Sequence, residues 1–441
     1  MLAILTTTGR VLWRHWPALL VWFIAGITAR YFIIQLAGWI GGHVATFGML
    51  LLPLAVLARL VSFVGMFLVV REALRNLQAI APVPESARER RTMFLGSLMA
   101  SILPFFAVYT AAGHLREDAA EYARIALDVA SGIGFLAAVT GGEVADSDVA
   151  LEVSLGPWTL LIIAIAFSGR WAWKKWSAKL PRVTALLAVY LEVIWIAFAV
   201  ALISDAVESV SGWVDRRVAM VWLADVRAWV GEQLVPLAWI WDGIEWLLGE
   251  IGAIVIQPLA WLMIAGVIYG QTIVAEKLRI EHAMIARAKA RAERVPGVIR
   301  RRTAELGDEL ASRFKPMGRA LLLMWRAGPV LITGYILLYT LVLAIQPLLE
   351  RGIVTLIGPH ELTFWVTFST LIATAPILIA EPVRIAIVAG AYDATLKATR
   401  PARVAAQDGS IENRTNLPSW PVPPVPPSVG ESTLPSAPTS L

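Results

Sequence analysis

Apolar residues in this chain fall in long blocks separated by polar segments, and this pattern predicts membrane-spanning helices. A helix needs about 20 mostly apolar residues, at about 1.5 Å each, to cross the hydrocarbon core of a bilayer. The blocks that reach this length comprise residues 17–40, 46–70, 93–112, 151–169, 184–204, 251–274, 320–346 and 361–390. We therefore expect an all-α, polytopic transmembrane bundle of about eight spans, the shortest being 93–112 and 151–169.

Composition agrees with a membrane protein. Hydrophobic residues make up 58% of the 441 residues and charged residues 16%, whereas soluble domains carry about 25% charged residues. The absence of cysteine excludes disulfides, iron–sulfur clusters and thiolate zinc sites. The first block follows Arg10 and Arg14 and exceeds the roughly 7–15 residues of a cleavable signal sequence. It is predicted to be a signal anchor that stays in the protein as the first span.

The Lys and Arg residues predict the orientation. They concentrate before the first block and in residues 71–91, 170–182 and 277–319, with a few after 396. All these segments lie on one side if the N-terminus is cytoplasmic, as the positive-inside rule requires. The opposite side then carries Arg116, Arg124, Arg216, Arg217, Arg227 and Arg351. Both termini are therefore predicted to be cytoplasmic.

Two outer segments are long enough to hold helices of their own. Residues 113–150 are acidic, and Glu117 to Val139 is an Ala-rich, mildly amphipathic stretch that predicts a surface helix ending near Gly141. Residues 205–250 predict an interfacial helix, either a cap on the bundle or a guide for an amphiphile. The interfacial aromatic candidates there are Trp213, Trp222, Trp229, Trp239, Trp241 and Trp246.

Two cytoplasmic segments complete the predicted organisation. Residues 275–319 are strongly basic, and Lys or Arg beside a span attract anionic lipid of the inner leaflet by about 1 kcal/mol each. Phe314 is the one aromatic residue there, so base stacking does not favour nucleic acid. The helical domain is expected to occupy residues 1–400. Residues 401–441 form a Pro/Ser-rich tail, predicted to be disordered, that could dock a protein partner.

No motif indicates catalysis or a cofactor. The Walker motif, GxSxG and HExxH are absent from the sequence. Asp146 and Asp148 are too close together to form an EF-hand loop and lack its closing Glu. We therefore expect no cofactor and no metal, and the sequence favours a non-catalytic role while leaving an enzyme open.

Charged residues within the predicted spans are the strongest functional candidates. They are Arg30, Arg59, Glu192, Glu381 and Arg384. An Arg at the centre of a span costs about 2.5–3.5 kcal/mol on insertion scales, so each should face a partner or a polar cavity. Glu381 and Arg384 can pair locally at i,i+3. The other three have no local partner, and both structural pairing between spans and a path for an anionic substrate remain open.

These observations leave three functional hypotheses. The first is a non-catalytic transport or envelope component in a bacterial plasma membrane that handles an anionic or amphiphilic substrate, with Arg30 and Arg59 attracting the anion. The second is a scaffold that recruits partners through residues 275–319 and the Pro-rich tail. The third is a lipid-modifying enzyme that uses an acidic residue such as Asp118 or Asp146.

Overall fold

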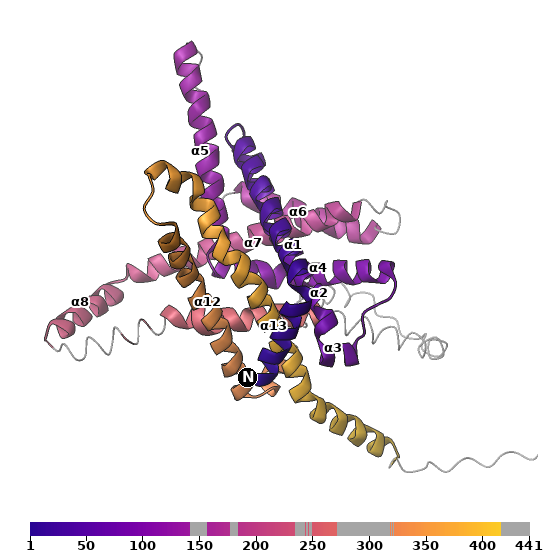
Figure 1. The fold of residues 1–441 in the computed structure, drawn as a ribbon. Coiled ribbons are helices and arrows are strands. Elements are labelled where there is room, and N and C mark those ends of the chain that lie inside the picture. The colour runs from indigo at the N-terminus through magenta and orange to yellow at the C-terminus, as the bar shows by residue number, and fades with distance from the viewer. Residues whose placement is uncertain are drawn as a thin grey trace, which may run out of the picture. The chain divides into compact units, whose positions relative to one another are not determined.

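The secondary structure of this protein is entirely helical throughout the part that a computed structural model describes (Figure 1). That part comprises residues 1–141, 157–176, 184–233, 249–270 and 322–415, with the single positions 243, 246, 318 and 320. The chain divides into two units, Met1–Ala398 and Thr399–Leu441, and the packing below belongs to the first. The predicted all-α class is confirmed.

Eight helices in the described residues are long and apolar enough to cross a membrane. They are α1 (Leu2–Gly41), α2 (Ala45–Val70), α4 (Ala87–Ala111), α5 (His114–Thr140), α7 (Thr184–Asp215), the helix Gly249–Gly270, α12 (Pro329–Ile357) and α13 (Leu362–Thr415). The shorter elements are η1 (Arg71–Ala73), α3 (Arg75–Ile80), α6 (Pro157–Trp176), α8 (Val218–Gln233) and the π-helical turn η2 (Gly252–Ile256). Seven of the eight overlap predicted spans.

The fourth predicted span, 151–169, is not among these eight helices. Its residues from 157 onward belong to α6, whose described apolar stretch is Leu160–Trp173, and residues 151–156 lie outside the described part of the chain. The eighth candidate is α5, which begins and ends close to the surface helix predicted at 117–139. Its charged residues lie between Arg116 and Asp128, and its last turns are apolar and exposed, with Phe135 73% accessible. Because of these charges near its start, the sequence did not identify α5 as a helix with an apolar stretch long enough to cross a membrane.

The first two helices form a closely packed hairpin. A methyl group added at Gly48 would lie 2.6 Å from the carbonyl oxygen of Ala37 and 2.6 Å from the Cα of Gly41, so α1 and α2 touch backbone to backbone. Further along, Ser62 donates a hydrogen bond to the carbonyl oxygen of Trp22 at 2.6 Å. This contact gives α1 and α2 a fixed register relative to each other.

Helix α5 lies beside α1 and runs in the same direction (Figure 1). Gly38 of α1 meets Ile125, and Gly42, just past the end of α1, meets Val129, so the contacts advance together along both helices. The preceding helix α4 ends at Ala111, and Gly113 turns the chain with φ of 82°, a left-handed conformation that favours glycine. The first turns of α5 are thereby placed against α1 well away from the α1–α2 turn.

The helix Gly249–Gly270, α12 and α13 contribute aromatic residues to the same hydrophobic core. The hydroxyl of Tyr335 donates to the carbonyl oxygen of Pro258 at 2.7 Å, just after the π-helical turn.

The last helix is longer than predicted, because the segment expected to be disordered from residue 401 continues α13 to Thr415. Residues 416–441 lie outside the described part of the chain.

Asp393 of α13 holds the connection between α2 and α4. Its carboxylate accepts hydrogen bonds from the backbone N–H groups of Asn76 at 2.9 Å and Leu77 at 3.0 Å, and from the Asn76 amide at 2.9 Å. We expect Asp393→Ala to lower the free energy of unfolding by about 1–2 kcal/mol, because it leaves buried donors without an acceptor. Thermal unfolding in detergent would measure this. Asp393→Asn keeps one acceptor oxygen and should lose less, so equal losses would contradict the assignment.

Candidate functional site

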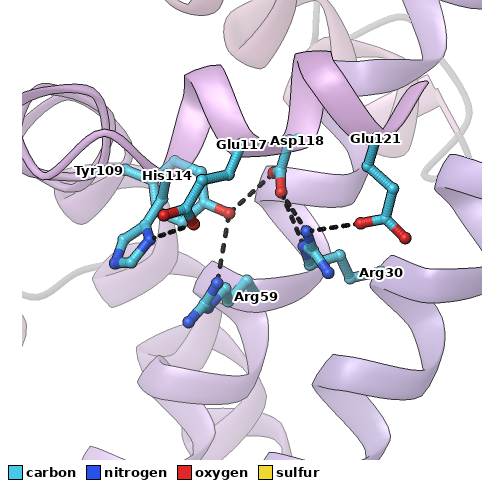
Figure 2. A network of polar contacts seen from close by, with 7 residues as sticks. All are labelled: Arg30, Arg59, Tyr109, His114, Glu117, Asp118 and Glu121. Carbon is cyan, nitrogen blue, oxygen red and sulfur yellow. Dashed lines mark hydrogen bonds and ion pairs between the residues drawn. The ribbon is translucent and has the colours of Figure 1, made fainter. Parts of the chain in front are cut away.

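Four helices bring charged and aromatic side chains together beside the α4–α5 turn. Figure 2 shows this polar cluster, which consists of Arg30 from α1, Arg59 from α2, Tyr109 from α4, and His114, Glu117, Asp118 and Glu121 from α5. The sequence analysis named the two arginines as candidates but assigned them no partner. The partners all come from α4 and the first turns of α5.

Arg30 is paired with two carboxylates of α5. Its Nε and Nη2 donate to Oδ1 of Asp118 at 2.8 and 2.5 Å, and Nη2 also donates to Glu121 at 3.2 Å. The Asp118 side chain is only 1% exposed, and its second oxygen accepts a hydrogen bond from the Tyr109 hydroxyl at 2.8 Å. Of the two interpretations left open by the sequence, pairing between helices therefore describes Arg30.

Arg59 is not paired in this way. Its Nη1 donates to the Tyr109 hydroxyl at 3.4 Å, a long hydrogen bond, and its guanidinium carbon lies 5.5 Å from the Tyr109 ring centre and 6.0 Å from that of Phe63. Its Nε is buried without a hydrogen-bond partner. Within the described residues no carboxylate lies within 4.0 Å of it. A buried donor left unsatisfied costs about 1–3 kcal/mol, so this arginine retains unused binding capacity.

The remaining predicted charges lie in two other places. Glu192 of α7 forms an ion pair with Arg170 of α6 and accepts a hydrogen bond from Trp195 at 3.2 Å. Glu381 and Arg384 form the predicted i,i+3 pair, with Nη2 of Arg384 2.5 Å from Oε2 of Glu381. The structure thus joins Arg30 and Arg59 in one cluster, whereas Glu192 and the α13 pair have other ionic partners.

The predicted interfacial tryptophans are exposed where the structure describes them. Trp213 at the end of α7, Trp222 and Trp229 on α8, and Trp246 are each between 57% and 64% accessible. Arg217 lies over the Trp213 ring, 3.3 Å from its centre. Trp239 and Trp241 lie outside the described residues, as do almost all of the basic segment 275–319 and, beyond Thr415, the tail.

Tyr109 and Glu121 were missed by the sequence analysis, and Asp118 was considered only as a possible catalytic acid. One available signal was the i,i+3 spacing of Asp118 and Glu121, which places both carboxylates on one face of a helix. In the structure Asp118 accepts hydrogen bonds on both oxygens, so it neutralises Arg30 and orients Tyr109. Asp146, the other acidic residue considered for catalysis, lies outside the described residues.

Comparison with known proteins gives no further assignment. No protein-family model, no curated protein and no solved structure matches this chain. Within the described residues, no group of three or more His, Asp or Glu side chains is placed to hold a metal ion. The polar cluster is therefore interpreted from its own geometry.

Proposed function

We propose that this protein is a non-catalytic membrane component that binds the anionic group of an amphiphilic substrate at Arg59. The eight long apolar helices indicate a multi-pass membrane protein. One observation supports the rest of the proposal: two arginines lie in the same cluster, and among the residues that the structure describes only Arg30 is matched by carboxylates. Arg59 has a buried Nε without a hydrogen-bond partner.

The surroundings of Arg59 suit an amphiphile. The aromatic rings of Tyr109 and Phe63 lie beside its guanidinium, so a ligand bound there would meet apolar surface next to the charge. Membrane-embedded ionisable residues of this kind are typical of substrate and ion pathways.

Binding of anionic lipid to the purified full-length protein tests this proposal. Native mass spectrometry would compare retention of phosphatidylglycerol, which is anionic, with that of phosphatidylcholine, which is zwitterionic. We expect the protein to prefer phosphatidylglycerol and Arg59→Gln to weaken that preference about tenfold, since a charged hydrogen bond contributes about 1.5–3 kcal/mol.

Arg326→Gln is the matched control for that experiment. Arg326 lies just before α12, and its side chain is exposed, so removing its charge should leave the preference unchanged. Equal retention of both lipids by the unaltered protein, or an unchanged preference in Arg59→Gln, would contradict the proposed function.

A further inference from the structure

The free edge of Arg59 indicates which anions the site accepts. A guanidinium presents its N–H groups in fixed pairs, and Nε–H and one Nη2–H point the same way as a two-pronged fork. In this structure Nη1 is the atom that bonds Tyr109. Within the described residues, Nε and Nη2 form no hydrogen bond, so both members of this fork are among the unused donors of Arg59.

Tyr109 keeps this fork in place. Its hydroxyl donates its proton to Asp118 at 2.8 Å, so the oxygen offers Arg59 a lone pair and no competing donor. Asp118 is in turn fixed by Arg30. The chain Arg30–Asp118–Tyr109–Arg59 therefore orients Nη1 toward the protein and leaves the opposite edge of the guanidinium for a ligand.

We propose that Arg59 binds an oxyanion headgroup that presents two oxygens and one negative charge, a carboxylate or a phosphodiester, through its Nε and Nη2. The inference rests on the proposed function and specifies its substrate class. Two-oxygen anions match the spacing of the fork and form bidentate pairs with arginine. A second negative charge on the headgroup would have no second cation to pair with in the cluster, because Arg30 is already engaged by Asp118 and Glu121.

Nε of Arg59 is covered in this arrangement, so a local movement must expose it before a headgroup can reach the fork. Gly113 in the α4–α5 turn has φ of 82°, and no atom lies within 4 Å of the position a methyl group would take there. The turn is therefore not packed on that side.

The variant Arg59→Lys distinguishes the contribution of the two paired N–H donors to binding from the contribution of the positive charge. Lysine keeps a positive charge at this position but supplies a point charge in place of two coplanar donors. With purified full-length protein in nanodiscs, we expect Arg59→Lys to bind dioleoyl phosphatidylglycerol and oleate about tenfold more weakly than the unaltered protein, and Arg59→Gln to bind them more weakly still. Dioleoyl phosphatidic acid, measured at a pH where it is a dianion, should bind the unaltered protein more weakly than phosphatidylglycerol.

The possible outcomes distinguish failure of the two-oxygen specificity from failure of the proposed function. If Arg59→Lys binds these lipids as tightly as the unaltered protein, or if the dianion binds as well as the monoanions, the inference is overturned while the proposed function stands. If the unaltered protein shows no preference for anionic lipid, the proposed function itself fails. Thermal unfolding confirms that each variant is folded, and Arg59→Gln gives a second comparison if the lysine variant does not accumulate.

Soluble anions identify the source of the headgroup. Diethyl phosphate and acetate carry the same two-oxygen, singly charged groups without acyl chains. If they fail to displace phosphatidylglycerol, the fork recognises a lipid, as we propose. Displacement by diethyl phosphate or acetate at concentrations comparable to the lipid would overturn the lipid assignment.

Discussion

Asp118→Ala is expected to lower the free energy of unfolding by about 3–5 kcal/mol, the usual cost of breaking a buried ion pair by removing one partner. Asp118 is 1% exposed and accepts hydrogen bonds from Arg30 and Tyr109. Its loss leaves Arg30 with only Glu121, 3.2 Å away and partly exposed, and leaves the Tyr109 hydroxyl without its acceptor. Unfolding of the purified protein by heat or by titrated denaturing detergent would measure the change.

A double-mutant cycle would show whether the cost arises from the pair. Arg30→Ala should also be strongly destabilising, and the double variant should lose much less than the sum of the two single losses, because neither charge is then left alone. Glu208→Ala is the matched control. Glu208 pairs with Arg116 at 2.9 Å, but both side chains are exposed, and such pairs contribute about 0–1 kcal/mol. Additive losses in the cycle would show that Arg30 and Asp118 do not stabilise each other.

Gly48→Val is expected to be the second most damaging substitution, with a loss of about 3 kcal/mol, the upper end of the usual cost of overpacking. Any side chain at Gly48 meets the backbone of α1, with Ala37 and Gly41 both 2.6 Å from the first added carbon. Backbone atoms cannot rotate away as a flexible side chain can, so α1 and α2 must separate. The thermal unfolding temperature of the purified variant would measure the effect.

Gly96→Val provides the comparison for Gly48. Gly96 lies within α4 and is exposed, and no atom lies within 4 Å of the position that an added carbon would take. Valine there should change stability little, because helix propensity differences amount to less than about 1 kcal/mol per residue. Equal losses at Gly48 and Gly96 would mean that the close contact between α1 and α2 does not limit stability.

The sequence alone determined the features of this protein that depend on neighbouring residues. Block length and hydrophobicity predicted seven of the eight long apolar helices, because a span is defined by about 20 successive residues. The i,i+3 pair of Glu381 and Arg384 was likewise predictable, since both residues lie on one helix turn. Helix α5 was found as a helix, but its apolar half was hidden by Arg116, Glu117 and Asp118 near its start.

Only the tertiary structure decided which charges are matched. Arg30 and Asp118 are 88 positions apart, and they meet because the chain breaks at Gly113 and α5 then runs beside α1 in the same direction. No local pattern specifies that direction, since it depends on how whole helices pack. The sequence marked Arg30 and Arg59 as equally costly within the membrane. Packing neutralised Arg30 and left Arg59 with a free edge, and that difference is the basis of the proposed site.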